Sequence, residues 1–195
     1  MKRVIFLFFV FFYFNSYSQS LRDSVHVKTD VFEIIYSEKF QQPLYAKYMV
    51  NCFIGKNSRK GMFFYRNDTI VTSDDNDYIN NIYDKGHLAP AGDFLCSKEK
   101  LYQTFSYLNC SLQNQNLNRG IWKLLEFHER DLAKKYKIVQ VEIFLHFSKN
   151  SVVLPSGATV PDSFEKVITY NGKIERYLFK NEPPLYYDIN KYLIK

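Results

Sequence analysis

A strong alternation over residues 137–147, with apolar side chains at every second position from Val139 to Phe147, is the feature that most constrains how this chain can fold. Successive side chains on a strand point to opposite faces, so the pattern predicts a strand with one buried and one solvent-facing side. Two further segments, residues 164–170 and 173–179, flank Asn171-Gly172. This dipeptide is preferred in tight hairpin turns. We therefore expect a central antiparallel sheet.

A long segment with helical spacing precedes the alternating strand. Over residues 118–136 apolar side chains recur every three or four positions, with charged residues between them, which is typical of a helix with one buried face. A shorter helix is expected over residues 97–108, with Ser97 at its start and Glu99 in its first turn. The other expected elements are extended segments over 21–50, a short strand over 61–65, a loop over 66–83 and an irregular tail from Asn181. Together they predict an α+β fold in which strands dominate.

The first 18 residues have the order of a secretory signal peptide. A basic start is followed by an unbroken apolar run over residues 4–14, and Ser16 and Ser18 precede the expected cleavage point. The run is too short for a membrane-spanning helix, which needs about 20 residues. We therefore expect one domain over residues 19–195, in a secreted or periplasmic protein without membrane insertion. A retained membrane anchor is the alternative.

Charge and cysteine content narrow the chemistry without fixing it. The net charge of the chain is +6 and falls to +4 once residues 1–18 are removed. Such a mild positive excess suits an anionic partner but does not identify one. The three cysteines, Cys52, Cys96 and Cys110, match no zinc-binding spacing. One disulfide with a thiol left over and three buried thiols are both open.

The candidate catalytic and metal-binding residues lie between Tyr83 and Arg130. The ordinary pKa of a histidine is near 6.5, so His87 can take a proton from water at neutral pH. The amide oxygen of Asn118 can hold a hard cation, and Mg²⁺ suits such a sparse site because it keeps most of its waters. Glu126, two turns along the same helix, can orient those waters. Arg130 lies one turn further and can pair with Glu126 or with a phosphate.

Each of these residues also has a plain structural interpretation. An asparagine at the start of a helix is usually a cap, and the spacing of Glu126 and Arg130 suits a surface ion pair. The asparagine- and glutamine-rich residues 109–118 suit a solvated loop. Spacing alone therefore does not establish an active site.

Several short motifs nevertheless fall in the order of a known signature. They are Asp84-Lys85-Gly86-His87-Leu88-Ala89-Pro90, Thr104 to Asn109, Leu117 to Trp122, Leu125-Glu126 and, more weakly, Val160 to Val167. Together they resemble the DNA/RNA non-specific endonuclease family. The resemblance implies a ββα-metal fold, in which two strands carry the histidine and the following helix carries a metal-binding asparagine. It also implies Mg²⁺- or Mn²⁺-dependent hydrolysis of phosphodiester bonds in DNA and RNA, with little sequence preference.

The resemblance further assigns roles to individual residues. His87 becomes the general base, Asn118 the direct metal ligand and Glu126 an acid that acts through water. Lys85 and Arg130 are expected to offset charge on the phosphate. The two remaining assignments, Asn109 and Gln113, are expected to support the site and bind substrate.

Three positions depart from the family pattern. Lys85 stands where arginine is usual, and Leu112 stands where proline is usual. An upstream arginine has no clear counterpart, with Thr72 near its place and Arg66 close by. Two alternatives to the nuclease therefore stay open. One is a module that binds nucleic acid in a salt-dependent way without cleaving it, and the other is a purely structural exported domain.

Overall fold

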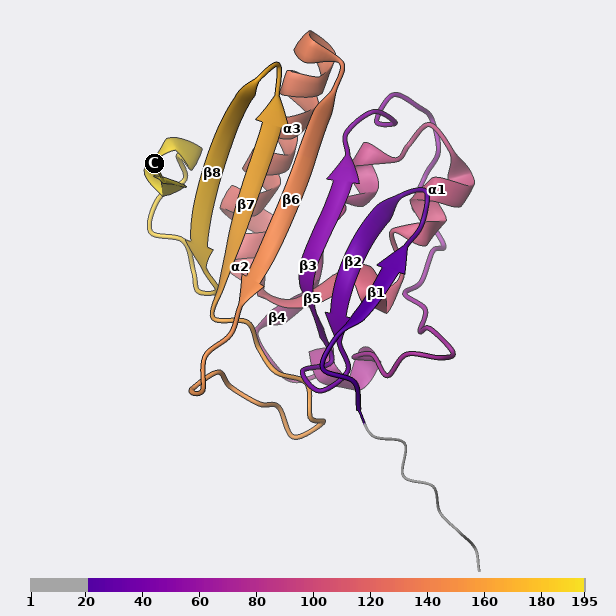
Figure 1. Ribbon diagram of the computed structural model, residues 1–195, viewed down its shortest axis with the longest axis vertical. Coiled ribbons are helices and arrows are strands. Elements are labelled where there is room, and N and C mark those ends of the chain that lie inside the picture. The colour runs from indigo at the N-terminus through magenta and orange to yellow at the C-terminus, as the bar shows by residue number, and fades with distance from the viewer. Residues whose placement is uncertain (1–20, 195) are drawn as a thin grey trace, which may run out of the picture.

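A computed structural model describes residues 21–194, so the predicted signal peptide lies outside the described residues. The strands are β1 (Val25–Lys28), β2 (Phe32–Ser37), β3 (Gln42–Met49), β4 (Tyr83–His87), β5 (Cys110–Asn114), β6 (Val139–His146), β7 (Ser163–Tyr170), β8 (Lys173–Lys180) and β9 (Leu193–Ile194). Within the described residues, seven of them form one antiparallel sheet in the order β1-β2-β3-β6-β7-β8-β9 (Figure 1). β4 and β5 pair with each other in a separate antiparallel sheet.

The helical elements are short apart from α3. They are η1 (Asp75–Tyr78), η2 (Ala91–Asp93), α1 (Lys98–Gln103), η3 (Tyr107–Asn109), α2 (Gln115–Leu117), the π-helical turn η4 (Asn118–Trp122), α3 (Lys123–Tyr136) and η5 (Ile189–Tyr192). Among residues 21–194 no helix is both long and apolar enough to cross a membrane.

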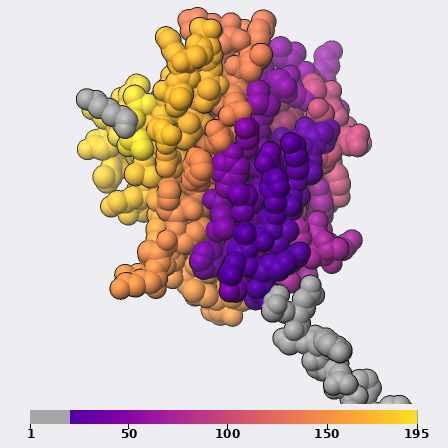
Figure 2. Space-filling model, in the orientation of Figure 1, coloured from indigo at the N-terminus to yellow at the C-terminus, as the bar shows by residue number. Residues whose placement is uncertain are grey.

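The helices cover one face of the large sheet. In Figure 1 α3 lies behind β6 and β7, and Figure 2 shows the opposite face, where the strands themselves form the surface. Leu125 and Leu132 of α3 belong to the same buried core as Val139, Val141 and Ile143 of β6. Alternate residues of β6 are buried, as the sequence pattern predicts. The sheet therefore serves as the platform on which α3 is fixed.

The smaller sheet and the helix form a ββα unit. β4 and β5 run antiparallel, and α2, η4 and α3 follow β5 with no intervening loop. The Asn114 side chain makes this tight junction possible, because Oδ1 accepts the backbone N–H groups of Asn116 (3.0 Å) and Leu117 (3.4 Å). The arrangement predicted from the resemblance is therefore present.

Several element boundaries differ from those expected. Residues 61–65 form no strand, and only an isolated bridge pairs Tyr65 with Ser106. The helix expected over 97–108 starts at the Ser97 cap but ends at Gln103. The long helix opens as the π-helical turn η4, because Gly120 leaves helical geometry there. The Asn171-Gly172 hairpin forms as predicted, with φ values of 44° and 71°.

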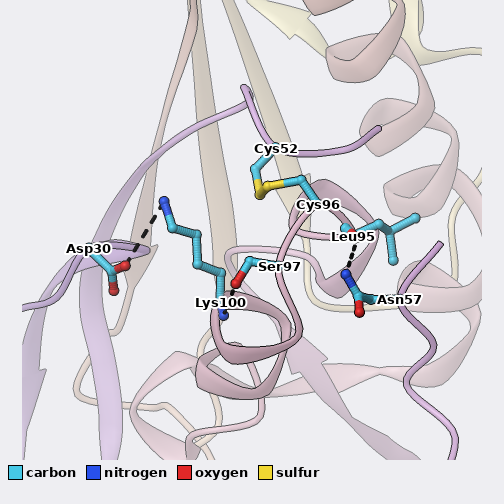
Figure 3. Close-up of a disulfide and its surroundings, with 7 residues drawn as sticks. All are labelled: Asp30, Cys52, Asn57, Leu95, Cys96, Ser97 and Lys100. Carbon is cyan, nitrogen blue, oxygen red and sulfur yellow. Dashed lines mark hydrogen bonds and ion pairs between the residues drawn. A yellow bond between two sulfur atoms is a disulfide. The ribbon is translucent and has the colours of Figure 1, made fainter. Parts of the chain in front are cut away.

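A disulfide joins Cys52 to Cys96 and leaves Cys110 as a buried thiol. It ties the segment after β3 to the loop before α1 (Figure 3). Two hydrogen bonds reinforce the tie: Cys96 N donates to Cys52 O at 2.8 Å, and Asn57 Nδ2 donates to Leu95 O at 2.8 Å. The chain that continues from Asn57 is therefore held against the loop that follows β4.

Candidate active site

One cavity brings together three of the residues expected to carry the chemistry. It has a volume of about 270 Å³ and is lined by the end of β4, η2, η4 and α3. His87, Asn118 and Glu126 all line it. The other lining residues are Arg59, Pro90, Ala91, Arg119 and Lys123. The fold therefore collects a base, an amide, a carboxyl group and three cations around one hollow.

His87 lies at the end of β4, next to two aromatic rings. The centroid of its ring lies 5.0 Å from that of Phe64 and 5.1 Å from that of Phe105. Nε2 is buried and has no hydrogen-bond partner among residues 21–194. Burial, assisted by the positive charge of Arg59, lowers the pKa of His87 to about 4. The imidazole is therefore neutral at pH 7 and can accept a proton.

Asp84 orients the amide of Asn118. Nδ2 of Asn118 donates to Oδ2 of Asp84 at 2.9 Å. An ionised carboxylate accepts hydrogen bonds but donates none, so the amide nitrogen is the atom that faces Asp84. The amide oxygen of Asn118 is thereby left for the cavity. Sequence reasoning assigned no role to Asp84, although it lies in the motif that contains His87.

Asp84 also holds Arg119. Nε and Nη2 of Arg119 donate to the two oxygens of Asp84 at 2.8 and 2.6 Å. Such a two-pronged arrangement fixes both the position and the plane of the guanidinium group. Arg119 is otherwise exposed and lines the cavity. One carboxylate thus positions both an uncharged ligand candidate and a cation.

Glu126 enters the cavity from α3 and has an altered affinity for protons. Burial, partly offset by Lys166, raises the pKa of Glu126 to about 7. The neighbouring Glu129 acts in the same direction as burial. Glu129 is itself fully buried and accepts hydrogen bonds from Lys166 Nζ and Tyr48 Oη, both at 2.7 Å. A fully buried ion pair therefore lies beneath the helix that carries Glu126.

Arg59 is the functional candidate that the sequence did not reveal. The upstream arginine of the family pattern was sought near Thr72 and Arg66, but Thr72 is buried and Arg66 pairs with Asp74 at 3.3 Å. Arg59 instead lines the cavity. It follows Asn57 by two residues, so the Cys52–Cys96 connection brings it there. That disulfide was one of two arrangements left open by the spacing of the cysteines.

Lys85 and Arg130 do not line the cavity. Lys85 pairs with Asp75, and its Nζ lies 5.4 Å from the ring centroids of Phe64 and Tyr107. Arg130 donates to Asp93, which is fully buried, at 2.6 Å. Both cations are therefore held by carboxylates beside the cavity.

Asn109 and Gln113 are buried beneath the site, and neither reaches the cavity. Oδ1 of Asn109 accepts Ala89 N, while Nδ2 donates to the carbonyls of Ala89 and Thr104, all within 2.9 Å. Asn109 thus holds the turn that follows His87. Gln113 packs against Gly86, where an added Cβ would lie 2.6 Å from the Cβ atom of Gln113. That close approach explains the glycine before His87.

Leu112 occupies the position of the usual proline without disturbing the strand. Its side chain is fully buried, and its backbone N–H donates to Oε1 of Gln42 at 2.9 Å. Proline has no N–H and could not make this bond. Gln42 also accepts from Ser111 Oγ at 2.9 Å. The backbone N–H that leucine has and proline lacks at position 112 therefore finds an acceptor in Gln42 of β3.

Curated relatives with nuclease names match part of the chain. Nuclease EXOG, mitochondrial, from Danio rerio is 33% identical over 45% of this chain and 26% of its own length. Endonuclease G, mitochondrial, from Bos taurus is 28% identical over 66% of this chain and 50% of its own length. The chain thus spans at most about half the length of these relatives. Because both are named as mitochondrial, they contradict the expected secreted or periplasmic location, which was wrong.

A solved structure and a family model settle the class of the fold. The structure of the EndoG/EndoGI complex superposes with a TM-score of 0.78, at 24% identity, over 87% of this chain and 80% of that chain. It confirms the predicted ββα-metal fold. The family model for DNA/RNA non-specific endonucleases matches residues 12–191. The chain therefore belongs to the DNA/RNA non-specific endonuclease family.

Proposed function

We propose that the protein is a Mg²⁺-dependent endonuclease that hydrolyses phosphodiester bonds of DNA and RNA with little sequence preference. The observation that carries the proposal is the convergence of His87, Asn118 and Glu126 in one cavity with three cationic side chains. A neutral base, oxygen ligands and positive charge are what hydrolysis of a phosphodiester requires. Membership of the family supports the same activity.

His87 acts as the general base. Its neutral imidazole takes a proton from the attacking water, which must approach from the cavity because Phe64 and Phe105 pack beside the ring. Burial, and after it the positive charge of Arg59, lowers the basicity of His87 in the free protein. A bound phosphate would offset that positive charge, so substrate binding itself raises the basicity of His87.

The donor set fits a largely hydrated hard cation. No cluster of three or more His, Cys, Asp or Glu residues that could hold a metal exists within residues 21–194. The cavity instead offers the free oxygen of Asn118 and the carboxyl group of Glu126. Oxygen ligands in such small number suit Mg²⁺, and Mn²⁺ is the nearest substitute. When bound, the cation would stabilise charge on the phosphate and on the leaving oxygen.

The three cations hold the substrate. Arg59, Arg119 and Lys123 line the cavity and can contact phosphate oxygens. Phosphate contacts position a nucleic acid without reading its bases, so little sequence preference follows. Lys85 and Arg130 act indirectly, because they pair with Asp75 and Asp93 beside the cavity.

Digestion of supercoiled plasmid and of total RNA tests the proposal. We expect cleavage with Mg²⁺, none with EDTA, and a loss of at least about 100-fold in His87→Ala, as general bases typically contribute 10²–10⁴-fold. His26→Ala is the matched control, because His26 is exposed and its one ion-pair partner within residues 21–194 is Glu33. A folded protein that binds but never cleaves would favour the binding module. A His87→Ala variant as active as the native protein would remove the assigned base.

A further inference from the structure

A second hollow adjoins the candidate active site at the turn that contains Arg59. Arg59 lines the active-site cavity, and the next residue, Lys60, lines the second hollow. A hydrogen bond from Met62 N to Arg59 O at 3.1 Å closes the turn that carries both residues, so one turn contributes to both hollows. The remaining lining residues are Gly61, Met62, Lys98, Glu99 and Tyr102. The mechanism proposed above uses none of these residues.

Tyr102 gives this hollow an aromatic wall. Its ring stacks on that of Tyr65, with centroids 4.9 Å apart and planes inclined by 13°. The Tyr102 side chain nevertheless stays 47% exposed and lines the hollow. A ring that is fixed from one side and accessible from the other is a suitable platform for a planar ligand.

Charged groups surround that platform. Lys60 and Lys98 form no ion pair with any residue between 21 and 194, so both ammonium groups are free to bind an anion. Glu99 adds one carboxylate to the same lining. Two cations suit phosphates, and a carboxylate next to an aromatic ring can accept a hydrogen bond from a base amino group.

A shared core supports both hollows. Ala91, Leu101 and Phe105 form a small buried cluster against which Met62 and Tyr65 pack. Ala91 also lines the active-site cavity, and Phe105 lies beside the ring of His87. The second hollow therefore has a fixed position relative to the candidate base.

We propose that the second hollow is a nucleotide subsite for a single-stranded segment of the substrate, next to the bond that is cleaved. Tyr102 stacks a base, Lys60 and Lys98 hold phosphates, and Glu99 accepts from an exocyclic amino group. The segment is single-stranded because a base must leave its partner to lie flat on Tyr102. The subsite rests on the proposed nuclease function, which supplies the phosphate in the neighbouring cavity.

Binding of a fluorescent single-stranded DNA 12-mer, measured by anisotropy in EDTA, tests the subsite without turnover. Tyr102→Ala should raise Kd about 10-fold, within the range seen when stacking aromatics are removed, and Tyr102→Phe should keep native affinity. Tyr102→Ala should weaken the binding of a duplex of the same sequence by a smaller factor than it weakens the binding of the single strand. A change below twofold in Tyr102→Ala, with native melting temperature, would overturn the stacking role.

The lysines provide a second, independent measurement. Lys60→Ala/Lys98→Ala should reduce the slope of log Kd against log salt by about 1.4, since each phosphate contact to a single strand contributes about 0.7. The matched control is Lys149→Ala/Lys173→Ala, which removes the same charge from a turn and from the first residue of β8, both outside the two hollows. An equal change of slope in the control would reduce the two lysines to general surface charge and refute the subsite.

The two proposals fail in different ways. Native protein that cleaves plasmid but binds the 12-mer independently of Tyr102 refutes only the subsite. Native protein that cleaves nothing, yet binds the 12-mer through Tyr102, refutes the nuclease and keeps the nucleotide site.

Discussion

Replacing Asp84 by asparagine should weaken metal binding without changing the shape of the site. Three hydrogen bonds converge on Asp84, at 2.9 Å from Asn118 and at 2.8 and 2.6 Å from Arg119. An asparagine at position 84 offers one accepting oxygen and one donating NH₂ group in place of two accepting oxygens. When the NH₂ group takes the place of Oδ2, Nδ2 of Asn118 and Nε of Arg119 both lose their acceptor, and the Asn118 amide is free to turn its nitrogen into the cavity.

The size of the effect follows from the role of Asp84 as a support for a metal ligand. Loss of such an outer hydrogen bond typically lowers metal affinity or activity by about 10- to 100-fold. Hydrogen bonds to charged groups each contribute about 1.5–3 kcal/mol. We therefore expect the Mg²⁺ concentration for half-maximal activity to rise by about 10- to 100-fold in Asp84→Asn. Saturating Mg²⁺ should restore part of the rate.

Initial rates of plasmid nicking over a Mg²⁺ titration measure this effect. The matched control is Asp131→Asn on the same helix as Glu126, because Asp131 is exposed and, in the described part of the chain, forms an ion pair with Lys134 alone, at 2.7 Å. If Asp84→Asn melts normally and needs the same Mg²⁺ concentration for half-maximal activity as the native protein, Asp84 does not present the Asn118 oxygen. The same conclusion follows if Asp131→Asn raises that Mg²⁺ concentration as much as Asp84→Asn does.

Three further expectations follow from the same structure. Serine at both Cys52 and Cys96 should lower the free energy of unfolding by about 4 kcal/mol in urea titrations, because the bridge closes a loop with a separation of 44 residues. Lys166→Met should cost about 3–5 kcal/mol in the same assay, since it leaves the fully buried Glu129 carboxylate unpaired; replacing both by apolar residues should recover much of that loss. Burial raises the pKa of Glu126 to about 7, so this side chain becomes ionised as the pH rises through 7. The rate of plasmid nicking at low Mg²⁺ should therefore increase from pH 6 to 8. Glu126→Gln should flatten that rise.

The sheet and the ββα unit could be predicted because their signals are local. Alternation along β6 reports one buried face directly, and Asn171-Gly172 suits a turn with two positive φ values. Residues 61–65 gave a false strand signal. Met62, Phe64 and Tyr65 pack against a small cluster with Leu101 and Phe105, Phe63 is exposed, and the backbone makes only one isolated bridge, at Tyr65. Composition shows that a segment is buried but does not show what its backbone bonds to.

The positions of His87, Asn118 and Glu126 could be inferred from the order of their motifs. The ion-pair partners of the charged residues around them could not. Lys85 faces Asp75 rather than the cavity, and Arg130 is held by Asp93. Both partners come from other parts of the chain and are brought close only by the tertiary fold. A single sequence carries no signal that chooses between a carboxylate partner and a phosphate.

Residues 109–114 show the opposite error, in which polar composition suggested a solvated loop. All five residues of β5 are buried, and so is Asn109. Burial is tolerated at most of these positions because the polar groups find partners: Asn109 holds the turn after His87, Asn114 caps α2, and Gln42 satisfies the strand at Ser111 and Leu112. The Gln113 amide is the exception and has no hydrogen-bond partner within residues 21–194. The hydrogen bonds of the other residues join β5 to the neighbouring elements, so the polar residues fix the site from behind.

The same contacts bear on the departures from the family pattern. Lysine in place of arginine at position 85 alters a cation that pairs with Asp75 outside the cavity, and Leu112 gains a hydrogen bond from β3 that proline would lack. The positive charge that lines the cavity comes instead from Arg59, Arg119 and Lys123. Their positions depend on the disulfide, on Asp84 and on α3. Lys85 and Leu112 therefore alter residues that surround the cavity, and neither of them is among the residues that line it. This favours the nuclease over a module that binds nucleic acid without cleaving it.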